Sequence, residues 1–251
     1  MPVTSVVPQR YWDSLYENLE PRYDSQTNIL FADLFDRFLK PGGTCFEVGC
    51  YPGNFLIHLG RRFNYEVSGI DATPFVLTRM PERLRQHGLK IGRFYHGDFL
   101  QFQPEHLYDV VCSFGFIEHF TNFENVMEKH LRMVAPGGTL IVSCPNFRYA
   151  QFVFHRLLDP VNLSRHVLAA MDLSRWRQVL TRNGMEILHH DYYRTAGFWA
   201  DTPRPGRLAS HAVYYVKRIN QVIDLRMNYP NRFLSPYMIS ISRKKGTGDV
   251  R

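Results

Sequence analysis

The feature that most constrains this chain is a regular alternation of short apolar strands with amphipathic helices between residues 44 and 145. The strand-like runs are short, apolar and rich in β-branched or aromatic residues, whereas the helical stretches repeat their apolar residues every three or four positions. Strands are expected at 44–48, 66–71, 91–98, 108–114 and 139–145, and helices at 54–63, 73–88 and 123–134. This alternation predicts a doubly wound α/β domain, in which helices cover both faces of a mostly parallel sheet.

The chain on either side of this core extends the expected sheet to seven strands. The further elements expected are helices at 28–39 and 173–184 and strands at 185–194 and 235–244. We divide the chain into an aromatic, partly helical cap at 1–40 and the α/β domain at 41–251. Helical inserts near 147–171 and 195–231 could form a lid, a substrate subdomain or the face of a homodimer, or could simply pack against the domain.

Composition excludes several classes of protein. With 45% hydrophobic residues, the 251-residue chain has ample material for a core. The N-terminus has neither a basic region nor a long apolar one, and no later run approaches about 20 apolar residues, so we expect no membrane span and a cytoplasmic location. The four cysteines form no CxxC pair, which indicates reduced thiols rather than a disulfide or zinc framework.

The net charge of +7 requires that an anionic partner be considered. Lys and Arg are scattered along the chain, however, with one short cluster at 242–246 and no basic run interleaved with aromatic residues. This distribution favours a solvated basic surface on a small-molecule enzyme over a nucleic-acid-binding protein.

The stretch FEVGCYPGNF at 46–55 identifies a ligand site, because ligands of doubly wound sheets bind at the carboxyl ends of the strands. A dinucleotide would need GxGxxG, but Tyr51 stands where the second glycine would be and would meet a diphosphate with a side chain. Gly49 lets the chain leave the strand tightly, and Gly53 lets the next helix pack closely. Glu47 would be costly to bury unless it held cationic groups, hydroxyl groups or backbone amides, and an amino acid with a nearby sulfonium offers such groups.

At this point the chain resembles the class I S-adenosylmethionine-dependent methyltransferases. Their first motif, (E/D)xGxGxG, corresponds to Glu47, Gly49, Tyr51 and Gly53, which the resemblance implies as cofactor-binding residues. Over roughly residues 40–190 it also implies the Rossmann-like sheet of that family and S-adenosylmethionine as the cofactor.

Three later motifs add to the resemblance, and each follows an expected strand. The family's second motif is an acid that takes both ribose hydroxyls, here Asp71 followed by Ala72, and its third is an acid beside the adenine amino group. The remaining cofactor-binding residues implied are Asp98 and Phe99 after the third strand, and Ser113 and Phe114 at the end of the fourth.

One departure concerns the first motif, where Tyr51 and Pro52 replace small residues. The methionine carboxylate could therefore be held differently, with help from Tyr11 or Tyr16. Similar enzymes place an N-terminal tyrosine or tryptophan over the cofactor, which makes Tyr11 our candidate, with packing in the core as the alternative.

Methyl transfer from a sulfonium is an in-line displacement, so catalysis rests mainly on alignment and desolvation. A hydroxyl acceptor must also lose a proton, for which a histidine is suited. His119 is the first candidate for that base, with closing of the cofactor pocket or capping of a helix as its alternatives. His166 is the second candidate, with a surface or structural role as its alternative.

No metal is expected from the sequence. HExxH is absent, His189 and His190 point to opposite faces of a strand, and Ser113 stands where metal-dependent catechol-type relatives have an aspartate. The sequence also lacks the (N/D)PP(Y/F) motif of DNA and glutamine enzymes and the Lys-Asp-Lys-Glu arrangement of ribose 2′-hydroxyl enzymes.

The leading hypothesis is transfer of a methyl group to a hydroxyl of a small molecule, such as a sugar, a glycoconjugate or a secondary metabolite. N-methylation of a small amine is the nearest alternative. A tRNA or rRNA methyltransferase and a non-catalytic cofactor-binding scaffold are the other two.

Overall fold

The computed structural model describes residues 5–17, 19, 29–201, 205–206, 211, 213–216, 218 and 229–246. Its centre is a seven-stranded sheet with the strand order β3-β2-β1-β4-β5-β7-β6. The strands are β1 (Thr44–Val48), β2 (Glu66–Asp71), β3 (Lys90–His96), β4 (Tyr108–Phe114), β5 (Val134–Pro145), β6 (Met185–Tyr193) and β7 (Tyr237–Lys244). Strands β1 to β5 pair in parallel, and β7 lies antiparallel between β5 and β6, which confirms the mostly parallel, doubly wound sheet.

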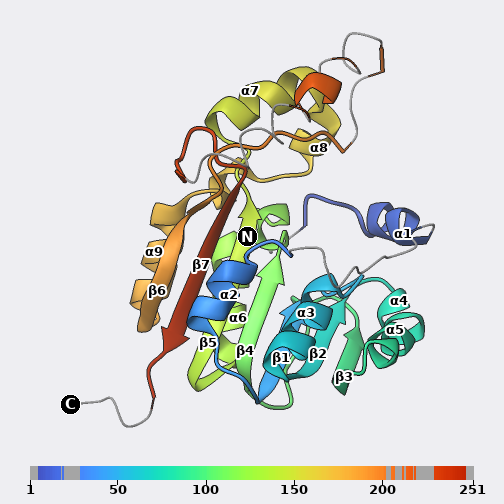
Figure 1. The fold of residues 1–251 in the computed structure, drawn as a ribbon, viewed down its shortest axis with the longest axis vertical. Helices are drawn as coiled ribbons and strands as arrows, with labels where there is room; N and C mark the ends of the chain where they lie inside the picture. The colour runs from blue at the N-terminus through green and yellow to red at the C-terminus, as the bar shows by residue number, and fades with distance from the viewer. Residues whose placement is uncertain are drawn as a thin grey trace.

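Helices cover both faces of the sheet (Figure 1). They are α1 (Gln9–Glu17), α2 (Ala32–Phe38), α3 (Asn54–Phe63), α4 (Phe75–Thr78), α5 (Met80–Gln86), α6 (Phe123–Met133), α7 (Tyr149–Leu158), α8 (Pro160–Ser164) and α9 (Leu173–Arg182), with 3-10 turns η1 (Ile117–His119) and η2 (Leu168–Ala170).

The two faces of the sheet carry separate apolar cores, because successive side chains of a strand point to opposite faces. Phe46 of β1 packs in the core that α6 and α9 complete, whereas its neighbour Cys45 packs in the core under α2, α3 and α5. Leu140 and Ile141 of β5 divide in the same way. Both faces of the central strands are therefore apolar, as expected for a sheet covered on both sides.

Most expected elements have the bounds that the sequence indicates, and the differences have local causes. The helix expected at 73–88 is two helices, α4 and α5, which meet at Arg79 just before Pro81. A proline has no amide hydrogen and is tolerated in the first turn of a helix, so Pro81 fits the start of α5 and not the interior of one long helix. The helix expected at 28–39 begins only at Ala32, after Phe31 in a left-handed conformation (φ 67°).

The first insert, at 147–171, forms α7, α8 and η2, and α7 and α8 lie beyond the carboxyl ends of β1 and β4 (Figure 1). Much of the second, at 195–231, including most of its expected long helix, lies outside the described residues. All four cysteines are free and buried, as expected. None of the helices within the described ranges is long and apolar enough to cross a membrane.

Candidate cofactor and acceptor site

The turn between β1 and α3 requires glycine at two positions. Gly49 has φ 71°, and a Cβ atom there would lie 2.7 Å from the ring of Phe116. Gly53 has φ 90°, and a Cβ atom there would lie 3.0 Å from Cε of Met80. Both positions combine a left-handed backbone with close approach of another residue, so a side chain would be strained at either.

The first three backbone amides of this turn are already hydrogen-bonded within the protein. The amides of Gly49 and Cys50 both donate to the carbonyl of Ile70, and the amide of Tyr51 donates to Oδ2 of Asp71 at 2.9 Å. A pyrophosphate is normally bound by free amides in such a turn. This turn is therefore not built to bind a diphosphate, which agrees with the side chain at position 51.

Asp71 ends β2 and holds the turn in place. Its carboxylate accepts hydrogen bonds from the amides of Tyr51 and Thr73, each at 2.9 Å. Burial raises the pKa of Asp71 to about 6, although these amides act in the opposite direction. At neutral pH the group is a buried carboxylate at the edge of a cavity, where it can accept hydrogen bonds from a diol.

This raised pKa makes a prediction for cofactor binding. Protonation of Asp71 removes an acceptor, so S-adenosylhomocysteine should bind best above pH 7 and weaken as the pH falls through about 6. We expect about tenfold weaker binding at pH 5 than at pH 7.5, measured by isothermal titration. The Asp71→Asn variant should bind S-adenosylhomocysteine weakly and with little dependence on pH. If the affinity of the wild-type protein does not change with pH, Asp71 is not the group that binds the cofactor as a carboxylate.

Glu47 is the second buried acid of the site. Its side chain is 4% exposed, and Oε2 has no hydrogen-bond partner among the described residues. Burial raises the pKa of Glu47 well above its usual range, whereas a hydrogen bond from the backbone of Leu56 lowers it. An unsatisfied carboxyl oxygen at the wall of a cavity is a position for a ligand that donates hydrogen bonds or carries positive charge.

These residues open onto one cavity of about 820 Å³. Ten of the residues proposed from the sequence line it, namely Glu47, Gly49, Tyr51, Gly53, Asp71, Ala72, Asp98, Phe99, Phe114 and His119. Three of them are acids, and no Lys or Arg is present among the described residues of the lining. The cavity therefore suits a ligand with positive charge and hydroxyl groups, as S-adenosylmethionine has, better than an anionic dinucleotide.

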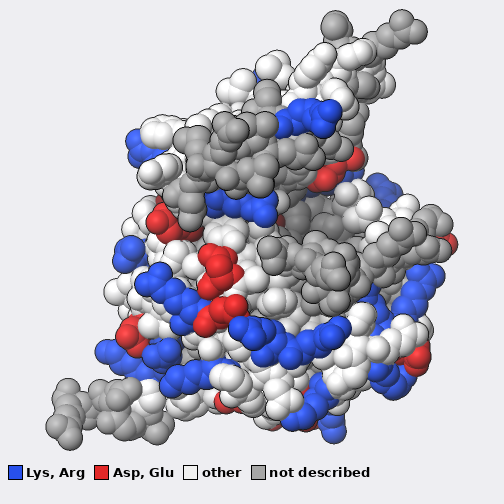
Figure 2. Space-filling view, in the orientation of Figure 1, with Lys and Arg blue, Asp and Glu red and all other residues white. Residues whose placement is uncertain are grey.

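The protein's excess positive charge lies elsewhere. On the face shown in Figure 2, Lys and Arg are spread over the surface with acidic residues between them, as the sequence indicates. The electrostatic character of the site is thus set by its buried acids and not by the net charge.

The other three proposed residues, Tyr11, Ser113 and His166, do not belong to the lining, and two aromatic residues of α1 replace Tyr11. Trp12 and Tyr16 line the cavity, and Tyr16 packs against Tyr51 with 4.9 Å between ring centroids. Tyr11 instead packs under the guanidinium of Arg165 at 3.8 Å. Residues four apart share a face of a helix, whereas Tyr11 is rotated away by one position. The spacing of Trp12 and Tyr16 was the signal in the sequence that could have identified this face.

Ser113 is fully buried in β4, one position before the cavity-lining Phe114. Because neighbouring residues in a strand point to opposite faces, only one of them can face the cavity. Phe114 also stacks on Phe55, another lining residue, with 3.7 Å between ring centroids.

His119 lies in η1, just beyond the end of β4, and is 7% exposed. Its Nδ1 is 2.9 Å from the carbonyl oxygen of Arg165, and its ring centroid is 4.8 Å from that of His166. Burial lowers the pKa of His119 to about 4, against hydrogen bonds to the backbone of Arg165 and Gly115. The ring is therefore neutral at pH 7, and its lone pair can accept a proton or bind a cation.

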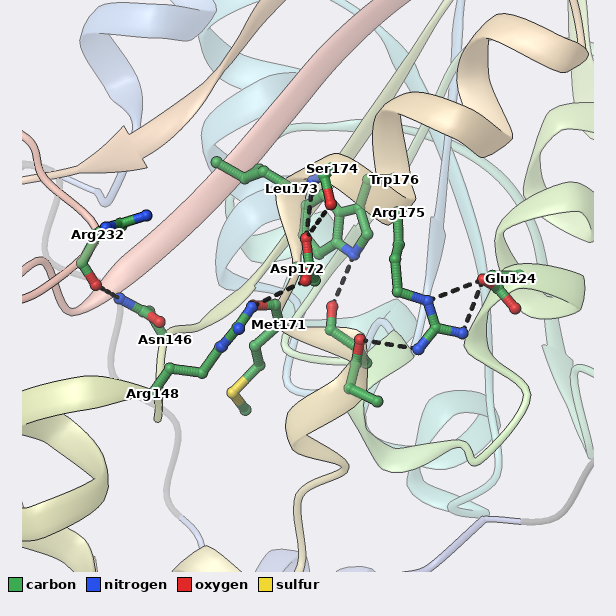
Figure 3. Close-up of polar contacts among 12 residues, drawn as sticks. Glu124, Asn146, Arg148, Met171, Asp172, Leu173, Ser174, Arg175, Trp176 and Arg232 are labelled. Carbon is green, nitrogen blue, oxygen red and sulfur yellow. Dashed lines mark hydrogen bonds and ion pairs between the residues drawn. The ribbon is translucent and has the colours of Figure 1, made fainter.

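Two ion pairs hold the ends of the first insert, which carries His166 between them (Figure 3). The guanidinium of Arg148 donates to the carbonyl of Met171 at 3.1 Å and to the carboxylate of Asp172 at 3.0 Å. Arg175 donates to Glu124 of α6 at 2.8 Å. These contacts tie the start of α7 and the start of α9 to each other and to α6, so the chain between them has a defined path beside the end of β4.

Comparison with known proteins adds an independent observation. The model of the family described as "Methyltransferase domain" matches residues 23–190. The demethylmenaquinone methyltransferase of Alkalihalophilus pseudofirmus is 24% identical over 205 residues, which cover 73% of this chain and 86% of that enzyme. The ajmaline N-methyltransferase of Rauvolfia serpentina is 27% identical over 116 residues, 45% of this chain and 40% of that enzyme. The match thus spans most of the first relative and less than half of the second.

Solved structures agree at the level of the fold. The MccD protein has a TM-score of 0.60 at 13% identity, covering 85% of this chain and 95% of that one. Phosphoethanolamine N-methyltransferase 2 of Haemonchus contortus, solved in complex with S-adenosyl-L-methionine, has a TM-score of 0.58 at 14% identity over 85% of this chain and 51% of that one.

Proposed function

Because this chain belongs to the family of S-adenosylmethionine-dependent methyltransferases, we propose that it transfers the cofactor's methyl group to a hydroxyl oxygen of a small molecule. The observation that carries this proposal is the position of His119, a neutral histidine at the wall of the cavity that also contains the acids at the ends of β1 and β2. A hydroxyl must lose its proton to become a good nucleophile, and a neutral imidazole in reach can accept it.

We propose that the cofactor is held by the residues at the carboxyl ends of β1 to β4. Asp71 would accept hydrogen bonds from the ribose, Asp98 would lie beside the adenine, and Glu47 would face the positively charged end. Asp98 is exposed at the cavity and accepts a hydrogen bond from the amide of Leu100 at 2.8 Å, which fixes its carboxylate. When bound, S-adenosylmethionine supplies an electrophilic methyl group, and the residues of the chain align it and exclude water.

We further propose that residues 1–40 act as a cap on the domain formed by 41–251. The contacts that support this are local: the amide of Val6 donates to the carbonyl of His119 at 2.8 Å, and Arg79 donates to the carbonyl of Glu17 at 3.1 Å. Trp12 of α1 also packs against His119, with 5.2 Å between ring centroids. A homodimer is a separate proposal, supported by the exposed apolar side chains of α7 and α8, which are Val153, Leu157 and Val161.

The acceptor is proposed to be a sugar, a glycoconjugate or a secondary metabolite. A small amine is the second candidate, and the specific observation in its favour is the likeness to ajmaline N-methyltransferase. The aromatic side chains of the first insert are not part of the described lining, and Phe147 instead packs in the core at 1% exposure. The acceptor would therefore meet the aromatic residues of α1 and η1 first.

The first experiment is isothermal titration with S-adenosylhomocysteine, with NADH for comparison. We expect S-adenosylhomocysteine to bind in the micromolar range or tighter, and we expect NADH not to bind. A screen with trideuteromethyl-labelled cofactor against panels of phenols, sugars, amines and ribosomal RNA would then locate the label by mass spectrometry. Label on oxygen of a small molecule is expected, whereas label only on nitrogen or on RNA would contradict the hydroxyl proposal.

A further inference from the structure

Three potential metal ligands from two distant segments meet beside the cavity. Glu118 and His119 belong to η1, and His166 lies just before η2. One ligand atom from each of the three lies within 4.8 Å of the other two. The amide of Val167 donates to the carbonyl of Glu118 at 2.7 Å, so a backbone hydrogen bond holds the two segments together.

Both histidines are oriented as metal-binding histidines usually are. Nδ1 of His119 is 2.9 Å from the carbonyl oxygen of Arg165, and Nδ1 of His166 is 2.7 Å from that of Asn162. A carbonyl oxygen can only accept, so Nδ1 carries the hydrogen in each ring and Nε2 keeps the lone pair. Metal-ligating histidines almost always donate their other ring N–H to a carbonyl or carboxylate in this way, which fixes the ring and its tautomer.

Glu118 is a buried acid of η1. Its side chain is 1% exposed, and Oε2 has no hydrogen-bond partner within the part of the chain that the structure describes. A carboxyl group in this setting is costly for the fold, and a cation is one of the partners that would remove the cost.

We propose that Glu118, His119 and His166 bind one divalent transition-metal ion, with its remaining coordination positions open toward the cavity. Two imidazoles and one carboxylate form a ligand set that suits zinc, iron or cobalt better than magnesium or calcium, which prefer oxygen ligands alone. His119 lines the cavity, so the open positions face the space that the acceptor would occupy.

The ion would also change how a hydroxyl acceptor is activated. Nε2 of His119 cannot bind an ion and accept a proton at the same time. With the ion bound, an acceptor hydroxyl that coordinated it would release its proton to solvent water, because the cation would lower the pKa of that hydroxyl. This second role rests on the proposed hydroxyl acceptor, whereas the binding of the ion does not.

The test uses the full chain without a histidine tag, freed of metal with a chelator and titrated with Co²⁺ in the absence of acceptor. We expect one Co²⁺ ion to bind per chain, as monitored by its visible d–d absorption, and we expect Zn²⁺ to displace it. Glu118→Gln and His166→Ala should each weaken Co²⁺ binding by about 100-fold or more. His106→Ala, which removes an exposed histidine from the loop before β4, should leave it unchanged.

Two further measurements decide the outcome. Neither Glu118 nor His166 belongs to the described lining of the cavity. Both variants should therefore still bind S-adenosylhomocysteine, and this binding shows that they are folded. In the NMR spectrum of the Co²⁺-loaded wild-type protein, two exchangeable, paramagnetically shifted imidazole N–H signals are expected, one from each Nδ1. Absence of saturable Co²⁺ binding, equal binding by the folded variants, or absence of those two signals overturns the proposal.

Failure of the metal site and failure of the proposed function can be told apart. Co²⁺ is measured without acceptor or methyl donor, so its absence leaves methyl transfer with His119 as the base. Conversely, if the acceptor screen places the label on nitrogen, the hydroxyl proposal fails, but the Co²⁺ stoichiometry and the NMR signals still test whether the ion binds.

Discussion

Replacing Asp71 with alanine should reduce the affinity for S-adenosylhomocysteine by at least about 100-fold while the protein stays folded. In the proposed complex the carboxylate accepts two ribose hydroxyls, and each hydrogen bond to a charged group contributes about 1.5–3 kcal/mol. Two such bonds correspond to a factor of about 100 or more in the dissociation constant. Asp71 also fixes the amides of Tyr51 and Thr73, so the same substitution loosens the turn that shapes the cavity. Isothermal titration measures the loss.

The matched control for this substitution is Asp36→Ala. Asp36 is a surface acid that pairs with Arg62 at 2.8 Å and is not part of the described lining. The Asp36→Ala substitution should change neither the affinity for S-adenosylhomocysteine nor the cooperative thermal unfolding by more than a small amount, because exposed ion pairs contribute little to stability. Unchanged affinity in Asp71→Ala would remove Asp71 as the ribose acceptor.

Replacing His119 with alanine should lower turnover by about 10²- to 10⁴-fold, the usual contribution of a general base. Affinity for S-adenosylhomocysteine should change far less, because the acids proposed to hold the cofactor are at the ends of other strands. The measurement is kcat and KM on an acceptor found in the labelled screen, together with isothermal titration of the cofactor product. A loss of kcat without a matching loss of cofactor affinity indicates a group that acts in the transition state.

His106→Ala is again the matched control and should keep wild-type turnover. Normal turnover of His119→Ala on the true acceptor would exclude His119 as the base and would also exclude a catalytic role for an ion that it binds. If His119 acts through an ion, the wild-type enzyme should lose turnover after chelation and regain it with the metal that binds in the Co²⁺ competition. If it acts as the base alone, chelation should have no effect.

Local patterns were sufficient to predict the sheet and one end of the site. β1, β4 and α3 have the expected bounds, because a strand buried on both faces and a helix between two glycines are marked by neighbouring residues. Glu47 was proposed because an acid in a buried strand is visible in the sequence, and Asp71 was proposed because it matches the second motif of the family that the chain resembles. The family match to residues 23–190 agrees with the motifs that these residues form.

The sequence was less informative where the direction of a side chain depends on packing. Tyr11 and Trp12 are adjacent aromatic residues, and in the sequence only the spacing of Trp12 with Tyr16 distinguishes them. The docking of α1 turns Trp12 and Tyr16 to the cavity and leaves Tyr11 under Arg165. The apolar spacing was also insufficient for the helix expected at 73–88. The spacing continues past Arg79, whereas Pro81 lies in the first turn of a second helix.

The sequence by itself therefore determined the order of the strands along the chain and the glycines of the turn after β1, which follow from the conformational and burial preferences of neighbouring residues. It also placed acids at the strand ends, where the motifs of the resembled family expect them. Only the tertiary structure decided that Glu118 and His119 meet His166. That meeting depends on the path of the insert, which is set by long-range contacts such as Arg148 with Asp172 and Val167 with Glu118. Contacts between segments so far apart leave no periodic pattern in a single sequence, which is why no metal was expected before the fold was known.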